Sequence, residues 1–389
     1  MDRVQLTPRP DWRKTVEGQG LTWHTTEEGR VYWDESAYWR FSAEEVDRIE
    51  AATDTLYGMC LQAIDKVVAG GELAAFGYDP AAIALIEASW RQRSYEPTLY
   101  ARFDLAFDGN DLKLLELNGD TPTSLVEAAV VQWWWMEDRF PGADQFNSIH
   151  DKLAEAFALY RRTTPDSPRL HLTSVAPHPE DEGTVEYLAV CAAGAGLATT
   201  IVGLSDIGWR EGDGAGRFVD LDDAPISALF KLVPWEWMLE DQFGPKLARE
   251  VLAGRLRLIE PAWKMVASNK HLLVTLAEMF PGHELLLPAT TSAVEAARFG
   301  DYVKKPVRGR EGANVAIVRA GETIASSDGA YANDAFIYQK RAQLAQADGN
   351  YAVIGSWVVN RQAAGMGVRE SASPITNNLA RFVPHIIEG

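Results

Sequence analysis

Two short stretches near residue 110 alternate strictly between apolar and polar side chains. They are 101–107 (ARFDLAF) and 112–118 (LKLLELN), and the polar sequence 108–111 between them is typical of a turn. The pattern predicts a β-hairpin in which Asp108 pairs with Leu112. The face that should be buried consists of Phe103, Leu105, Phe107, Leu115 and Leu117.

The opposite face of this hairpin is polar. The expected pairing places Asp104 opposite Glu116, and Arg102 opposite Asn118. Carboxylates facing each other across a strand ladder repel, so neutralising Glu116 should not destabilise the fold. Two carboxylates and an amide oxygen suit Mg²⁺ bound together with substrate phosphates, and Arg102 could bind a phosphate oxygen. A solvated strand face with an incidental ion pair is the alternative.

Helical patterns dominate the first segment, residues 1–100. The sequence SAEE at 42–45 is a capping box that opens a helix through about residue 68, and Asp79–Pro80 opens a shorter helix.

The second segment, residues 101–165, contains the hairpin and a helix that we expect to begin at 120–122. At this helix start, Thr121, Thr123 and Ser124 could turn free backbone N–H groups toward an anion. Simple capping explains them equally well.

The third segment, residues 166–250, has a β–α–β pattern: RLHLTSVA, TVEYLAVCAAGAG and ATTIVGL, followed by another strand, ISALFKLV. This order predicts an α/β unit with parallel strands. The acidic run Glu180, Asp181 and Glu182 opens its helix, where the helix dipole alone accounts for negative charge.

The fourth segment, residues 251–389, contains two lysines that break local rules. Asn269 caps a helix, and Lys270 falls in its first turn, the unfavourable end for a cation. Lys305 shares the apolar face of the strand 302–307, although lysines on such faces usually reach for water. Residues that violate local preferences are candidates for a functional site.

A glycine- and arginine-rich loop, 308–314 (RGREGAN), follows this strand. Its composition suits a flexible cover over phosphates, although it has neither Walker A nor dinucleotide-binding spacing.

Length and composition narrow the possibilities further. A chain of 389 residues should form two or three domains, and its net charge of −18 argues against nucleic acid as a partner. A cationic substrate such as a polyamine is compatible with this charge. The sequence shows no membrane span and no secretory signal at its start, and its only cysteines, Cys60 and Cys191, have no histidine or cysteine nearby in sequence. These features predict a cytoplasmic protein.

Several longer motifs together resemble the synthetase domain of the glutathionylspermidine synthase family, a group of divergent ATP-grasp ligases, and in particular its stand-alone branch. The motifs are RFDLAF, KLLELNGDTPTSLVEAA, PAWKMVASNK, YVKKPVRGREGANV, IYQK, DGNYAVIGSWVV, GMGVRE and SPITNNLARFVPHI. The resemblance implies an α/β (α+β) chain with a rearranged ATP-grasp fold, an additional α/β (pre-ATP-grasp-like) domain at 166–250 and a nucleotide-binding lobe at 251–389.

The resemblance also assigns roles to individual residues. Asp104, Glu116 and Asn118 match Mg²⁺ ligands, and Arg102 matches a phosphate-binding arginine. The nucleotide-binding positions are Lys270, Lys305, Gly309, Arg310, Gly312 and Gln339, with Gln339 beside the adenine. Arg369 matches an arginine near the transferred phosphoryl group, and Glu180, Asp181 and Glu182 match acidic residues that help to hold the amine.

The implied function is ATP- and Mg²⁺-dependent ligation of a small acid, glutathione- or peptide-like, to a polyamine-like amine, with no nucleic acid or membrane as partner. Two alternatives remain open. One is an amino-acid or peptide ligase with other substrates, and the other is an ATP-binding sensor without catalysis.

Overall fold

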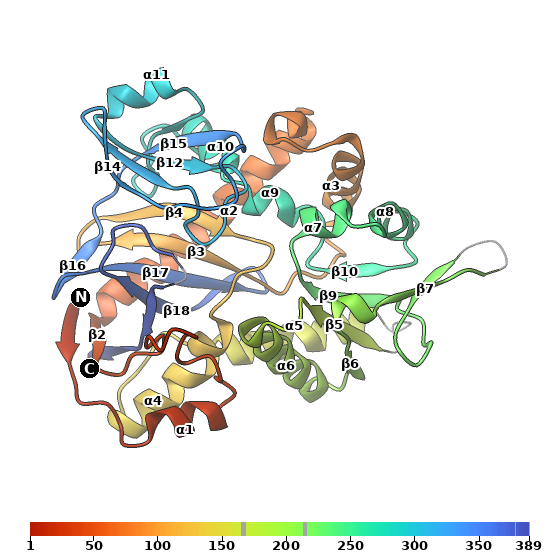
Figure 1. The fold of residues 1–389 in the computed structure, drawn as a ribbon, viewed down its shortest axis with the longest axis horizontal. Coiled ribbons are helices and arrows are strands. Elements are labelled where there is room, and N and C mark those ends of the chain that lie inside the picture. Colours follow the sequence, from red (N-terminus) through yellow and green to blue (C-terminus); the bar gives the residue numbers. More distant parts are fainter. Residues whose placement is uncertain (165–168, 213–215, 378, 389) are drawn as a thin grey trace.

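A central antiparallel sheet carries the predicted hairpin (Figure 1). The structure, a computed structural model, describes residues 1–164, 169–212, 216–377 and 379–388. The strand order of this sheet is β19–β18–β17–β3–β4, with β16 paired to β17. Its strands are β3 (Tyr100–Phe107), β4 (Leu112–Asn118), β16 (Ala345–Ala347), β17 (Asn350–Val359), β18 (Gln362–Ser371) and β19 (Arg381–Val383).

The predicted register of the hairpin is confirmed at the end that carries the four polar residues. Arg102 pairs with Asn118, and Asp104 pairs with Glu116. All four side chains therefore occupy one face of two hydrogen-bonded strands.

At its turn the hairpin departs from the prediction. Phe107, rather than Asp108, pairs with Leu112, and a β-bulge opposite the Asp104–Leu105 step absorbs the extra residue. Because of this bulge, Leu114 is buried and Leu115 borders a cavity instead of joining the core. The assignment of Leu115 to the buried face is wrong.

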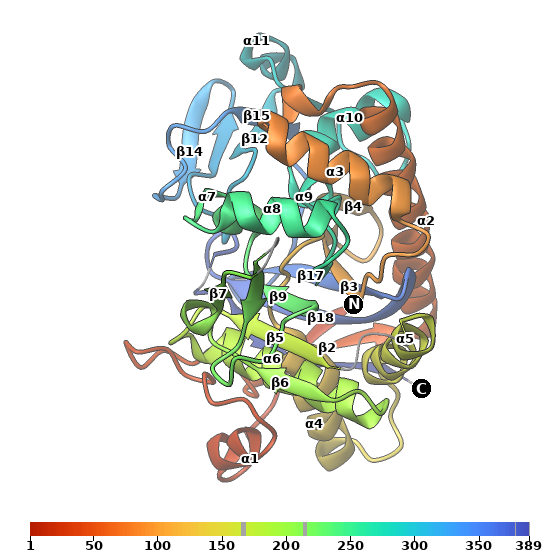
Figure 2. The same ribbon diagram turned by 90° about the vertical axis from the view of Figure 1, so that its right-hand side faces the viewer.

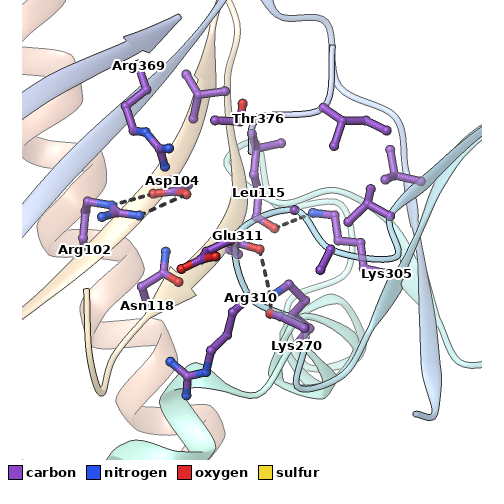
Figure 3. Close-up of a pocket in the computed structure, with 18 of the residues that line it drawn as sticks. Arg102, Asp104, Leu115, Asn118, Lys270, Lys305, Arg310, Glu311, Arg369 and Thr376 are labelled. Carbon is purple, nitrogen blue, oxygen red and sulfur yellow. Dashed lines mark hydrogen bonds and ion pairs between the residues drawn. The ribbon is translucent and has the colours of Figure 1, made fainter. Parts of the chain in front are cut away.

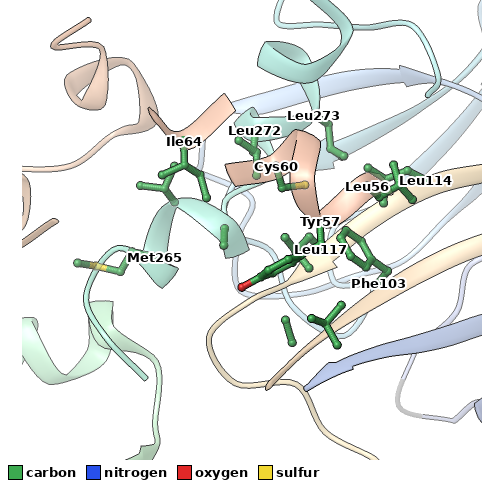
Figure 4. Close-up of a cluster of buried hydrophobic side chains, with 14 of the residues drawn as sticks. Leu56, Tyr57, Cys60, Ile64, Phe103, Leu114, Leu117, Met265, Leu272 and Leu273 are labelled. Atoms are coloured by element: carbon green, nitrogen blue, oxygen red, sulfur yellow. The ribbon is translucent and has the colours of Figure 1, made fainter. Parts of the chain in front are cut away.

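Two helices cover the buried face of the hairpin: α2 (Ala43–Ala69) and α10 (His271–Met279). The helix α2 begins with the predicted capping box, in which Glu45 N donates to Ser42 Oγ at 3.2 Å and Ser42 N donates to Glu45 Oε2 at 3.0 Å. Figure 4 shows the resulting cluster, which includes Leu56, Tyr57, Cys60, Phe103, Leu114, Leu117, Leu272 and Leu273.

A second antiparallel sheet stands above the hairpin in Figure 1 and has the order β11–β15–β12–β13–β14. Its strands are β11 (Ala289–Thr290), β12 (Asp301–Pro306), β13 (Ala316–Arg319), β14 (Glu322–Ser326) and β15 (Phe336–Lys340). The short helices α9 (Lys264–Ser268) and α11 (Ala293–Ala296) belong to the same part of the chain.

The predicted β–α–β unit is confirmed. Its parallel sheet has the order β10–β9–β5–β6, and α6 (Pro179–Gly194) connects β5 to β6. The strands are β5 (Leu170–Ser174), β6 (Thr199–Ile201), β9 (Ala228–Leu232) and β10 (Arg257–Ile259). The helices α7 (Trp235–Glu240) and α8 (Gly244–Leu252) follow β9, and β7 (Gly208–Arg210) pairs with β8 (Arg217–Val219). Figure 2 shows α8 and α6 on different sides of this sheet.

The N-terminal segment also contains strands that the sequence analysis did not predict. β1 (Asp2–Gln5) and β2 (Ala37–Ser42) form a sheet with β20 (His385–Glu388), which brings the two ends of the described chain together (Figure 1). The helices here are α1 (Trp12–Gly18) and α3 (Pro80–Gln92), and Asp79 caps α3 as predicted. In the described parts of the chain, no helix has the length and apolar character needed to cross a membrane.

The predicted helix start at 120–122 is wrong. The helix begins at Leu125, passes through a π-helical turn (Glu127–Val131) and continues as α4 (Gln132–Arg139), with α5 (Ile149–Thr163) after it. Asp120 does not cap the helix that follows it, because its carboxylate accepts hydrogen bonds from the Lys231 ammonium and, at 3.1 Å, from Trp235 N at the start of α7. This buried ion pair joins the end of the hairpin to the parallel sheet.

Asp120→Asn should lower the free energy of unfolding by about 3 kcal/mol, because it leaves the buried Lys231 ammonium without its counter-charge. Urea denaturation measures the change. Asp111→Asn, in the exposed hairpin turn, is the matched control and should have no effect. Adding Lys231→Met to Asp120→Asn should recover part of the loss, and equal stability of Asp120→Asn and wild type would contradict this account.

Candidate active site

A cavity of about 880 Å³ opens beside the polar face of the hairpin, within the size range of ligand sites. The central sheet, the second antiparallel sheet and the β–α–β unit all contribute to its wall. The predicted site residues that line it are Arg102, Asp104, Glu116, Asn118, Thr121, Thr123, Glu180, Asp181, Lys270, Lys305, Gly309, Arg310, Gly312 and Arg369. The fold thus collects side chains from all the predicted site segments at one place.

Three predicted residues do not line the cavity: Ser124, Glu182 and Gln339. Gln339 lies behind the wall, where its Oε1 accepts a hydrogen bond from Lys305 Nζ at 2.9 Å. Ser124 is buried, and its backbone N–H is occupied by Glu180 Oε1 at 3.3 Å. In this structure, the N–H of Ser124 is therefore not open to an anion.

Cations compensate both carboxylates of the hairpin. Arg102 Nε donates to Asp104 Oδ1 at 2.9 Å (Figure 3). Lys270 Nζ lies 3.1 Å from Glu116 Oε2. Arg369 comes from β18, and Figure 3 shows its guanidinium pointing toward Asp104. The cavity therefore alternates positive and negative groups over a short distance.

Both predicted lysines are buried at this centre. Besides Glu116, Lys270 Nζ reaches the carbonyl oxygen of Gly309 at 2.6 Å. The ammonium group of Lys305 is buried rather than extended into solvent, and its Nζ donates to Leu115 O at 3.0 Å as well as to Gln339. The bulge at Leu115 thus supplies an acceptor for a buried ammonium group.

The pKa values follow from this arrangement. Burial opposes the charge on Glu116, but Lys270 and Lys305 outweigh it and lower the pKa of Glu116 to about 2. Burial lowers the pKa of Lys305 to about 8, against the attraction of Glu116. Since the Glu116 carboxylate is stabilised by its surroundings, we now predict the opposite of a neutral or stabilising effect: Glu116→Gln should be less stable than wild type without metal.

The oxygen groups of the hairpin fit a hard divalent cation such as Mg²⁺. Asp104, Glu116 and Asn118 offer two carboxylates and an amide, the oxygen donors such ions prefer. Within the described residues, the buried Nδ2 of Asn118 has no hydrogen-bond partner, and no cluster of three or more His, Cys, Asp or Glu side chains suited to a metal occurs. Any metal here would depend on the amide and on further ligands from a substrate.

The acidic residues at the start of α6 also border the cavity. Glu180 and Asp181 line it, together with His178, the half-exposed Trp237 and the apolar Leu232. Burial raises the pKa of Asp181 to about 6, opposed by His178 and assisted by Glu180. The sequence analysis assigned no role to His178, although it caps α6 by accepting from the backbone N–H of Asp181.

The loop 308–314 borders the cavity and packs closely against other segments. Gly312 has φ +69°, and a Cβ at this position would lie 2.3 Å from the carbonyl oxygen of Thr376. Only glycine fits both the backbone conformation and the close approach. Arg310 contacts Thr121 Oγ1 at 2.7 Å.

The two cysteines do not belong to the site. Both Cys60 and Cys191 are free and buried. His150 Nδ1 lies 3.8 Å from Cys191 Sγ, a neighbour that sequence spacing did not reveal. Burial raises the pKa of Cys191 to about 11, so its thiol stays protonated and unreactive.

The depressed pKa of Lys305 predicts a pH-dependent stability. An unfolded lysine keeps its proton up to about pH 10.5, whereas folded Lys305 loses it near pH 8. Between these values the unfolded state binds more protons, so wild type should gain about 3 kcal/mol over Lys305→Met as the pH rises from 8 to 10.5. Denaturation over this pH range measures the gain, with the neighbouring Lys304→Met as control. Parallel pH curves for all three proteins would disprove the assignment.

Comparison with known proteins places this chain in a family. The family model described as glutathionylspermidine synthase preATP-grasp matches residues 3–388. A Haemophilus influenzae protein named "Putative acid--amine ligase" is 39% identical over 398 residues, covering 99% of each chain. The bifunctional glutathionylspermidine synthetase/amidase of Escherichia coli is 25% identical and covers 90% of this chain, which spans 59% of that protein. The trypanothione synthetase of Crithidia fasciculata is 29% identical and covers 74% of this chain, which spans 47% of that protein.

The fold also has a solved counterpart. A glutathione synthetase-like effector from Globodera pallida superposes with a TM-score of 0.59 at 9% identity, over 97% of this chain and 96% of the effector. This likeness confirms the predicted mixed α/β, ATP-grasp type of fold. The chain belongs to the glutathionylspermidine synthase family and is an enzyme of the ligase class.

Proposed function

We propose that the protein joins a carboxylic acid to an amine and converts ATP to ADP and phosphate in the reaction. The observation that carries this proposal is the interleaving of Arg102, Lys270 and Lys305 with Asp104 and Glu116 in one cavity. Such an array can receive a triphosphate, because the phosphates would pair with the cations and release the carboxylates from their ion pairs.

The nucleotide would lie between the hairpin and the second antiparallel sheet. Lys270 and Lys305 point into this part of the cavity, and the loop 308–314 borders it. Gln339 would act indirectly, because it holds Lys305 from behind the wall. Asp104, Glu116 and Asn118 would hold Mg²⁺, which supplies positive charge to the β- and γ-phosphate oxygens when it is bound.

The reaction would proceed in two displacements. A carboxylate oxygen of the acid attacks the γ-phosphorus, the bond to the bridging oxygen breaks, and ADP leaves. The nitrogen of the amine then attacks the acyl carbon of the acyl phosphate, phosphate departs and the nitrogen loses a proton. Arg102 and Arg369 would stabilise the negative charge of the transferred phosphoryl group, since both guanidinium groups reach the cavity.

The amine would bind at the acidic end of the cavity. Glu180 and Asp181 can pair with ammonium groups there, and Trp237 can cover the apolar chain of a polyamine-like molecule. For the acid we propose a glutathione- or peptide-like molecule. Both substrate classes agree with the names of the relatives.

The decisive experiment is mass spectrometry of products after incubation with ATP, Mg²⁺ and a panel of thiols, peptides, amino acids and polyamines. We expect an amide of a peptide-like acid and a polyamine, with one ADP formed for each amide. An amide of other substrates would instead identify an amino-acid or peptide ligase. Nucleotide binding without turnover on any pair would favour a sensor and contradict the proposal.

Glu116→Gln should reduce amide formation on the order of 100-fold, because the proposed metal loses one of its charged ligands. Chelation of Mg²⁺ should have the same effect on wild type. Glu322→Gln, in an exposed strand, removes the same charge and should leave turnover unchanged. Near-normal turnover in folded Glu116→Gln would rule out the metal site as proposed.

A further inference from the structure

Arg310 links the loop 308–314 to the opposite wall of the cavity. One of its terminal nitrogens donates to Thr121 Oγ1 at 2.7 Å, and the other lies 3.7 Å from Glu236 Oε2. Figure 3 shows its side chain pointing away from Asp104 and Asn118. Arg310 thus contacts other protein segments rather than the metal-binding face of the hairpin.

Glu236 is held in place by the ion pair that joins the hairpin to the parallel sheet. It follows Trp235, whose backbone N–H donates to Asp120, and Asp120 in turn pairs with Lys231. Burial and the nearby Asp120 raise the pKa of Glu236, whereas Arg310 opposes that rise. Glu236 does not line the cavity, so a direct contact with substrate does not explain it.

Two other side chains of the loop contact residues close to it in sequence. Arg308 donates to Asp334 Oδ1 at 2.8 Å, and Asn314 Oδ1 accepts from Tyr331 N at 2.7 Å. Both contacts tie the base of the loop to its own lobe. The contact of Arg310 instead crosses to the substrate side and brings an opposite charge to a partly buried carboxylate.

We propose that Glu236 is a positioning residue that holds Arg310 and thereby keeps the loop 308–314 closed over the cavity. The importance of closure rests on the proposed function, because an acyl phosphate must be kept from water. If water reaches it, the water oxygen attacks the acyl carbon, the bond to the phosphate oxygen breaks, and the free acid and phosphate leave without amide.

Hydrogen–deuterium exchange of the whole protein, without nucleotide, tests the contact itself. In Glu236→Gln the loop 308–314 should exchange roughly two- to five-fold faster than in wild type, the range expected for a partly exposed ion pair. Glu240→Gln is the matched control, because Glu240 is exposed one turn further along α7. Equal loop exchange in Glu236→Gln and wild type would overturn the proposal.

A double-mutant comparison separates this role from general stability. If Glu236 acts through Arg310, adding Glu236→Gln to Arg310→Gln should not accelerate loop exchange further. A full additional increase would mean that Glu236 acts elsewhere and would also overturn the proposal. Arg310→Gln alone should accelerate exchange at least as much as Glu236→Gln, because it also loses the contact with Thr121, and it provides a second test if Glu236→Gln does not fold.

Turnover gives a readout that a purely structural residue would not change. In Glu236→Gln the ratio of phosphate released to amide formed should rise roughly two- to five-fold, while Glu240→Gln keeps the wild-type ratio. An unchanged ratio alongside faster loop exchange would remove the catalytic part of the proposal. If wild type forms no amide with any substrate pair, the proposed function fails, and the exchange measurements still decide whether Glu236 holds the loop.

Discussion

The site depends on one electrostatic constraint: Asp104 and Glu116 lie side by side on paired strands and must be neutralised. Each carboxylate is compensated by a cation, Arg102 from the same strand and Lys270 from another lobe. Because Lys270 lies outside the hairpin, the ion pair of Glu116 forms only when the start of α10 packs against the hairpin, whereas Arg102 compensates Asp104 within one strand. The same cations are then available for an anionic substrate, so one arrangement serves both the fold and the chemistry.

The Asp120–Lys231 ion pair fixes the hairpin to the parallel β–α–β unit. Asp120 follows the hairpin strand that carries Asn118 after a single residue, and its buried carboxylate fixes that strand end to β9 and the start of α7. The same ion pair therefore links the positions of the polar face of the hairpin, of Thr121 and of Glu236. A displacement of one of these groups should therefore displace the others.

Local patterns predicted much of the candidate site. Strand alternation, helix-capping sequences and charged residues at unfavourable positions can all be recognised in short stretches of sequence. They gave the register of Asp104 and Glu116 and singled out Lys305, whereas the role expected for Arg369 came only from family resemblance. Local patterns failed where a distant partner decides the structure. Asp120 resembles a helix cap in its local sequence, and nothing nearby reveals that its partner Lys231 lies on a remote strand. The bulge at Leu115 likewise places a carbonyl oxygen against Lys305, which comes from another sheet.

The pairing of β3 with β17 has a consequence for how the protein folds. The hairpin strand joins a strand from near the other end of the described chain, and β17 in turn pairs with β18, which carries Arg369. Contacts between residues so far apart in sequence form slowly, because a long stretch of chain must first be ordered. The cavity should therefore take shape late in folding, after the helices and the parallel unit, whose contacts are more local.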